Sequence, residues 1–155
     1  MRFLLALFVA LFLAPARLFP ADAPAATAAA TPATAAPRFA SEIAAFEKSD
    51  AEHPPEKGAV LFIGSSSIRL WKSLAQDFPN QHVLNRGFGG SEISDSIGYI
   101  DRIVVPYAPR LIVMYAGGND IHSGKSAERV IDDFKTFVEK VRGKLPNVPI
   151  DYISI

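Results

Sequence analysis

Hydrophobic positions from residue 38 onward follow two different periodicities. Four short runs of apolar and β-branched residues have the length of buried strands, at 59–63, 82–85, 111–115 and 148–155. Between these runs, apolar side chains recur every three or four residues, which predicts helices over 41–51, 67–74, 93–104 and 127–145. Strands that alternate with helices across short loops indicate an α/β domain with a parallel sheet. We therefore expect a flavodoxin-like three-layer α/β/α sandwich.

The two ends of this pattern carry further expectations. Ser41 is the expected N-cap of the first helix. The helix over 127–145 has the longest apolar stripe, formed by Val130, Ile131, Phe134, Phe137, Val138 and Val141. The last apolar run has no helix after it to cover the sheet, so we expect a domain that is incomplete at its C-terminus, with an exposed sheet edge and face.

The first 37 residues differ from the rest. Arg2 precedes an apolar run from Phe3 to Ala14, and small residues follow at 14–16, which is typical of a secretory signal peptide. The run is shorter than the roughly 20 residues that a membrane-spanning helix needs, and an uncleaved anchor is the alternative. Residues 20–37 are almost entirely Ala, Pro and Thr, as in a flexible or semi-extended spacer.

This division predicts a signal peptide over 1–19, a linker over 20–37 and one domain over 38–155. The protein would be exported to the periplasm or the extracellular space, with no membrane insertion beyond the signal peptide.

Composition and charge exclude several classes of function. Lys plus Arg and Asp plus Glu number 16 each, so no net field favours nucleic acid. The chain has no cysteine, which excludes a disulfide framework, a thiolate zinc site and a cysteine nucleophile. A hydroxyl nucleophile remains possible. We expect no metal and no cofactor, and the sequence leaves the oligomeric state open.

Three loops rich in Gly, Ser and Asn follow the first three predicted strands, where parallel sheets bind ligands. Ser66 directly follows a strand and could attack a carbonyl, or the serines there could simply cap a helix. Gly90 can turn tightly and present its N–H to a ligand, or it can be an ordinary loop glycine. Asn119 could donate to an oxyanion, or it could belong to a turn.

Taken together and in order, the three loops resemble the conserved blocks of the SGNH hydrolases, the GDSL-like lipase/acylhydrolase family. The matching segments are 62–71 (FIGSSSIRLW), 85–91 (NRGFGGS) and 117–120 (GGND).

The resemblance implies a serine esterase or acylhydrolase with Ser66 as the nucleophile. The Ser66 N–H, the Gly90 N–H and the Asn119 side chain would form the oxyanion hole. Such an enzyme hydrolyses carboxylic esters through an acyl-enzyme on the serine, and the substrate here would be a small molecule or carbohydrate, such as a carbohydrate acetyl ester or a short-chain lipid.

The sequence departs from the family pattern at two points. Ser65 occupies the position of Asp in the GDSL signature, which leaves the substrate uncertain. The family takes its catalytic Asp and His from a late D-x-x-H motif, and none follows Gly117, so we expect both residues to be absent from this chain and the chain to be nearly inactive. His122 is a less favoured substitute base. His53 and His82 are expected to lie away from the site.

A different class of function uses the same architecture without hydrolysis. A non-catalytic flavodoxin-like module could bind phosphate at Gly64–Ser67 or bind carbohydrate. No Walker lysine follows this loop, and no G-x-G-x-x-G lies at a strand-to-helix turn, so this reading stays the alternative.

Overall fold

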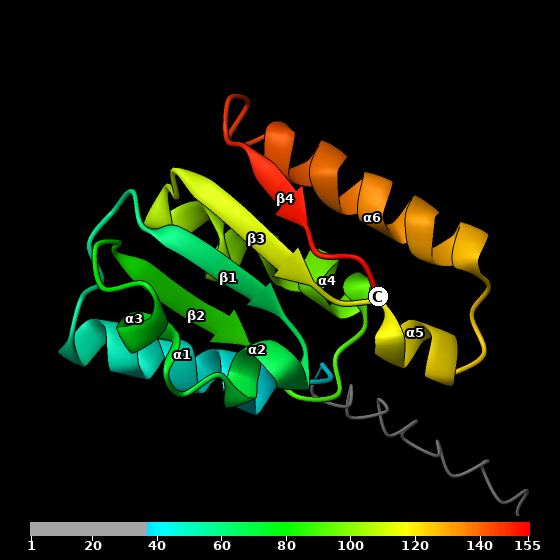
Figure 1. Cartoon of the computed structure of the whole chain (residues 1–155), viewed down its shortest axis with the longest axis horizontal. Coiled ribbons are helices and arrows are strands. Elements are labelled where there is room, and N and C mark those ends of the chain that lie inside the picture. Colours follow the sequence, from blue (N-terminus) through cyan, green and yellow to red (C-terminus); the bar gives the residue numbers. More distant parts are fainter. Residues whose placement is uncertain (1–36) are drawn as a thin grey trace, which may run out of the picture. The chain divides into compact units, whose positions relative to one another are not determined.

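The computed structural model of the chain describes residues 37–155, and its centre is a four-stranded sheet. All neighbouring strands are parallel, and they lie in the order β2-β1-β3-β4 (Figure 1). The strands are β1 (Val60–Gly64), β2 (Val83–Gly87), β3 (Leu111–Tyr115) and β4 (Ile150–Tyr152). This confirms the predicted α/β class with a parallel sheet. The predicted signal peptide and all but the last residue of the predicted linker lie outside the described residues.

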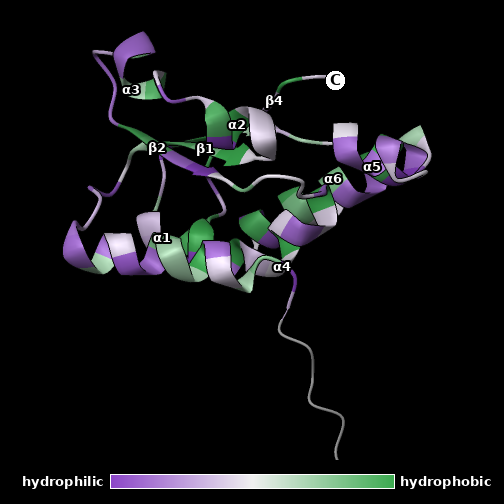
Figure 2. Cartoon of the chain, turned by 90° about the horizontal axis from the view of Figure 1, so that it is seen from below, coloured by the Kyte–Doolittle hydropathy of each residue, from purple (hydrophilic) through white to green (hydrophobic). Residues whose placement is uncertain are grey.

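Helices lie on both faces of the sheet. The longer helices are α1 (Ala40–Glu52), α4 (Ile93–Ile103) and α6 (Ala127–Arg142), and they lie on one side. The short helices α2 (Ser66–Leu70) and α3 (Leu74–Asp77) lie on the other side (Figure 2). A further short helix, α5 (Gly118–His122), directly follows the loop after β3. Within residues 37–155, no helix combines the length and hydropathy that membrane spanning requires.

The main core lies between the sheet and the longer helices. Strand β3 shows why, because Ile112 and Met114 are fully buried on that side, whereas Leu111, Val113 and Tyr115 on the opposite side are partly exposed. The opposite side has a smaller cluster built around Val60, Phe62, Ile68 and Leu74. The alternation along β3 therefore separates a closed face of the sheet from a partly open one.

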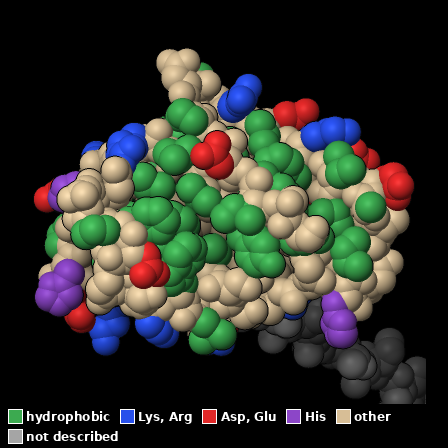
Figure 3. Space-filling model, viewed as in Figure 1, with side chains coloured by type: hydrophobic (Ala, Val, Ile, Leu, Met, Phe, Trp, Pro, Cys, Tyr) green, Lys and Arg blue, Asp and Glu red, His purple; other side chains and the backbone are tan. Residues whose placement is uncertain are grey.

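The partly open face presents a broad area of apolar side chains, visible in Figure 3. A hollow of about 410 Å³ lies there, lined by residues of β1, β2, β3 and the chain after β4, together with the aromatic residues Trp71 and Phe78.

The helix predicted over 67–74 is interrupted near Trp71. The indole ring packs against Phe62 and Phe78, with ring centroids 5.7 and 5.8 Å apart, and its Nε1 donates to Asp77. Phe62 of β1, together with Asp77 and Phe78 at the end of α3, thus holds the indole against the sheet. The apolar spacing alone could not indicate this break.

Three helix details differ from prediction. Ser41 is not an N-cap, because α1 begins at Ala40 after Phe39 in a left-handed conformation, and the Ser41 hydroxyl donates to Glu42. Ile131 is 53% exposed and does not belong to the buried stripe of α6. The helix itself ends at Arg142 rather than at residue 145. At the start of α1, Phe39 packs on Phe88 with ring centroids 5.1 Å apart, and this contact fixes where the helix begins.

A buried polar cluster fastens α1 to the sheet. Arg86 on β2 is 6% exposed, and its guanidinium contacts Asp50 of α1 at 2.5 Å and donates to the Tyr107 hydroxyl at 2.9 Å. The Tyr107 hydroxyl donates in turn to Asp50. Burial and the bond to Asp50 raise the pKa of Tyr107 to about 12, against the weaker opposing effect of Arg86. Asp50 and Tyr107 thus compensate the charge and the hydrogen-bonding groups of a guanidinium that is almost fully buried.

A change of Gly64 to Ala should destabilise the fold because the end of β1 has no room for a side chain. A Cβ there would overlap the carbonyl oxygen of Tyr115 on β3. We expect a loss of about 3 kcal/mol or more in the free energy of unfolding, measured by urea denaturation.

Gly98→Ala is the matched control. Gly98 is exposed within α4, and a Cβ there would meet no atom within 4 Å. This change should stabilise the protein by about 0.5–1 kcal/mol through helix propensity. Equal stability of the two variants would contradict close packing at the end of β1.

Candidate active site

The strand register brings the three predicted loops to one edge of the sheet. Gly64, the last residue of β1, is paired with Gly87 at the end of β2 and with Tyr115 at the end of β3. The segments after these residues therefore start side by side at the carboxyl edge. Backbone hydrogen bonds join them directly, from Phe88 N–H to the Gly64 carbonyl at 3.0 Å and from Ser65 N–H to the Tyr115 carbonyl at 3.4 Å.

Ser66 is the first residue of α2 and is partly exposed. As a first-turn residue its N–H has no acceptor within the helix, so that this donor is available to a ligand. The turn that presents Ser66 is held by Asn85 of β2, whose Nδ2 donates to the Ile68 carbonyl at 2.6 Å and whose Oδ1 accepts from Gly87 N–H at 2.9 Å. Asn85 thereby fixes α2 against the end of β2.

Gly90 lies on the second loop with a φ of +80° and is exposed. Most side chains disfavour this left-handed conformation, which explains a glycine at the turn. The Gly90 carbonyl accepts from the Arg38 guanidinium at 2.8 Å, and Arg38 also pairs with Asp95 of α4 at 3.3 Å. Arg38 thus supports the loop from the start of the domain.

Asn119 lies in α5 and contacts the second loop directly. Its Nδ2 donates to the Ser91 carbonyl at 2.8 Å, and the Ser91 hydroxyl donates to the Gly64 carbonyl at 3.4 Å. An amide nitrogen carries two hydrogens, so one N–H of Asn119 is left for a ligand. Asn119 is therefore placed against the loop that carries Gly90. Gly90 follows β2 and Asn119 follows β3, and these two strands flank β1, which precedes Ser66.

The predicted site residues gather at this edge, but several residues that hold them had no signal in the sequence. Asn85 and Ser91 fall inside the matching segments, yet nothing in their spacing shows which atoms they contact. Arg38 lies about fifty residues before the loop that it supports, so that only the folded chain reveals the contact.

None of the three histidines hydrogen-bonds to Ser66 among the contacts within residues 37–155. His53 directly follows α1, and His82 precedes β2 at the opposite edge of the sheet, where it pairs with Glu56 at 3.2 Å. His122 is the last residue of α5 and is exposed. In the same part of the chain, no group of three or more His, Asp or Glu residues is arranged to hold a metal ion.

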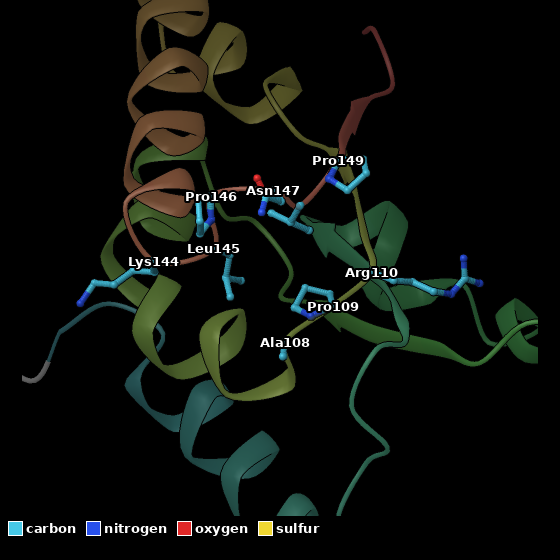
Figure 4. A pocket seen from close by; sticks show the side chains of 9 residues that line it. Ala108, Pro109, Arg110, Lys144, Leu145, Pro146, Asn147 and Pro149 are labelled. Atoms are coloured by element: carbon cyan, nitrogen blue, oxygen red, sulfur yellow. The ribbon is translucent and has the colours of Figure 1, made fainter.

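A second hollow lies at the other end of the sheet, where β3 and β4 begin. It measures about 320 Å³ and is lined by residues 108–110 and 144–149 (Figure 4). Its lining is rich in proline and contains none of the predicted site residues. The chemistry suggested by the sequence therefore lies at the carboxyl edge and not in this hollow.

The parallel α/β domain carries its serine, glycine and asparagine loops together at the carboxyl edge of the sheet, as the three sequence segments predicted. Residues 64–153 match the model of the GDSL-like lipase/acylhydrolase family. The chain belongs to this family of hydrolases, which confirms the resemblance drawn from the three loops.

Solved structures show the same fold at low sequence identity. A protein from Streptococcus pneumonia, assigned as a platelet activating factor, is 20% identical with a TM-score of 0.64, over 74% of this chain and 54% of that one. An acylhydrolase assigned in Bacteroides fragilis is 22% identical with a TM-score of 0.57, over the same shares. The SGNH-hydrolase family esterase AlinE4 is 19% identical with a TM-score of 0.56, over 64% of this chain and 60% of that one.

The chain spans about half the length of the first two of these structures. No curated protein matches it. The structural likeness establishes the flavodoxin-like fold, and the family match establishes the hydrolase class.

The Asn85→Asp variant should show a stability defect that depends on pH. A carboxylate would face the Ile68 carbonyl 2.6 Å away and could not donate to it, so the folded state would raise the pKa of the new carboxyl above its unfolded value of about 3.9. A group whose pKa is raised by folding favours the folded state below its unfolded pKa and loses that contribution as pH rises.

We therefore expect Asn85→Asp to be less stable than the wild type by about 1–3 kcal/mol at pH 7, with a smaller deficit at pH 3.5, in urea denaturation. Asn147→Asp places the same charge at an exposed position and should show little deficit at either pH. A deficit for Asn85→Asp that is constant across this range would contradict the role of Asn85 as a donor to α2.

Proposed function

We propose that the protein is a serine esterase or acylhydrolase that cleaves carboxylic esters at the carboxyl edge of the sheet. Ser66 is the nucleophile in this proposal, and the Ser66 N–H, the Gly90 N–H and the Asn119 amide are the oxyanion donors. The observation that carries it is the register of Gly64 with Gly87 and Tyr115, because it starts all three loops from the same edge. Membership of a hydrolase family gives the second support.

The proposed reaction has two acyl-transfer steps. A base removes the proton from Ser66 Oγ as the oxygen attacks the ester carbonyl, and the negative charge on the carbonyl oxygen is met by the three donors. Collapse of this intermediate expels the alcohol, which takes the proton from the base, and leaves an ester on Ser66. Water then attacks that ester and releases the acid, so that Ser66 is regenerated.

The base is the component that residues 37–155 do not place beside Ser66. A serine hydroxyl without a neighbouring base is a weak nucleophile, and loss of one triad member costs around 10⁴-fold or more in rate. We therefore expect residues 1–155 by themselves to hydrolyse esters very slowly.

The proposed substrates are carbohydrate acetyl esters or short-chain lipids. Export through the predicted signal peptide over residues 1–19 remains part of the proposal, because an extracellular or periplasmic hydrolase would meet such esters. Cell fractionation tests this part independently of activity. The intact mass of the purified protein shows whether the predicted signal peptide has been removed.

Replacement of Ser66 by Ala should abolish covalent labelling by a fluorophosphonate probe and any hydrolysis of p-nitrophenyl acetate. Both measurements are made on residues 1–155 and on the entire translated product of the gene. Labelling is followed by intact mass, and the labelled residue is identified by peptide mapping. We expect labelling of the wild type on Ser66.

Ser67→Ala is the matched control, because Ser67 is the next residue of α2 and is exposed. It should retain labelling and hydrolysis within about threefold of wild type, since it has no role in the proposed reaction and exposed side chains usually tolerate substitution. If Ser66 in the entire gene product stays unlabelled and no short-chain ester is cleaved, the esterase proposal fails and a non-catalytic phosphate- or carbohydrate-binding module becomes the better reading.

A further inference from the structure

Lys125 lies at the centre of a group of three carboxylates beside the candidate site. Its ammonium contacts Asp120 at 2.8 Å, Asp133 at 2.9 Å and Glu92 at 3.0 Å. These acids come from three different helices, because Glu92 is the N-cap of α4, Asp120 lies in α5 and Asp133 lies in α6. One ammonium thus links three elements that are separate in the sequence.

Burial makes these contacts strong. The Asp120 side chain is fully buried, that of Asp133 is 8% exposed, and Lys125 itself is only 21% exposed. Burial disfavours the ammonium, but the hydrogen bonds to the three carboxylates outweigh this effect and raise the pKa of Lys125 above its usual value. The hydrogen bond from Lys125 is also the main cause that lowers the pKa of Glu92.

The acids that Lys125 holds are neighbours of the residues that form the candidate site. Asp120 follows Asn119 directly, and its carboxylate also accepts the N–H of Ile93 at 3.2 Å. Glu92 follows Ser91, whose carbonyl accepts the Asn119 amide. Lys125 therefore closes a ring that runs from Asn119 through Asp120, Lys125 and Glu92 to Ser91 and back to Asn119.

We propose that Lys125 is a positioning residue that fixes the Asn119 amide against the Ser91 carbonyl and so sets the direction of its second N–H. It touches no reacting atom in the proposed reaction and acts through Asp120 and Glu92. As a statement about catalysis this rests on the proposed function, whereas the position of the Asn119 amide can be measured without any turnover.

The lengths of the hydrogen bonds around Asp120 explain why a charged side chain is needed at position 125. The hydrogen bonds from Ile93 N–H to the Asp120 carboxylate are long, at 3.4 and 3.2 Å, so by themselves they hold α5 weakly. Lys125 adds shorter charge-assisted contacts, at 2.8 Å to Asp120 and 3.0 Å to Glu92, and such bonds are about twice as strong as neutral ones. An oxyanion donor has to be held in place before reaction, because it is effective only if it need not reorganise.

The test uses the Lys125→Met and Lys125→Met/Asp120→Asn variants, with Arg129→Met as the matched control. Arg129 pairs only with Asp133 at 2.8 Å among the same acids, and its side chain is 63% exposed. The double variant removes the uncompensated buried carboxylate and so retains the fold if the single variant unfolds, yet it still lacks the link to Glu92.

The readout is the side-chain amide of Asn119 by NMR, in residues 1–155. We expect the Nδ2 proton bonded to Ser91 to exchange with water at least about tenfold faster in both Lys125 variants, and within about twofold of wild type in Arg129→Met. In the entire gene product, the same Lys125 variants should lower kcat at least about tenfold while KM stays nearly constant, as expected for a contact made in the transition state.

Wild-type exchange of the Asn119 amide in the double variant would overturn the proposal, since Lys125 would then only neutralise Asp120. An equal increase in Arg129→Met would also overturn it, because any loss of charge near Asp133 would have the same effect. Complete absence of ester hydrolysis by the entire gene product would count against the proposed function and would leave the exchange result to decide the role of Lys125.

Discussion

The close approach of β1 and β3 at Gly64 is the constraint on which the rest of the site depends. There is room for a hydrogen atom and not for a methyl group between the end of β1 and the Tyr115 carbonyl. This contact fixes where β1 and β3 stop relative to each other, and the pairing of Gly64 with Gly87 aligns the end of β2 with them. Ser66, Gly90 and Asn119 are attached to those ends by only a few residues, so their relative positions follow from backbone geometry more than from contacts among their side chains.

Much of this arrangement could be predicted from the sequence. Buried parallel strands are short and continuously apolar, and the strand over 111–115 has the predicted bounds. The α/β class follows from the alternation with helices, and the placement of three loops at one edge follows from parallel pairing. Ser66, Gly90 and Asn119 were found because each is a residue type that suits such a loop, in an order that resembles one family.

Other features depend on contacts between distant residues, which periodicity does not encode. The break near Trp71 exists because the indole packs on Phe62. Ile131 is exposed because the apolar stripe of α6 is wider than the face of the helix that the rest of the domain covers. Likewise, Lys125 reads as one of many lysines until the fold surrounds it with Asp120, Asp133 and Glu92. Sequence patterns indicate which faces are buried, but the identity of polar partners comes only from the assembled chain.

The order of the strands has a consequence for how the chain folds. β1 precedes β2 and β3 in the sequence but lies between them in the sheet, so it finds its second neighbour only after some fifty further residues have been added. Every pairing in the sheet is parallel and spans a helical connection, so that no hairpin can form early as a local nucleus. Loop closure therefore precedes any strand pairing, and such topologies fold slowly and expose unpaired strand edges meanwhile. A newly made chain of this kind stays open to proteases, chaperones and aggregation until these distant strands have paired.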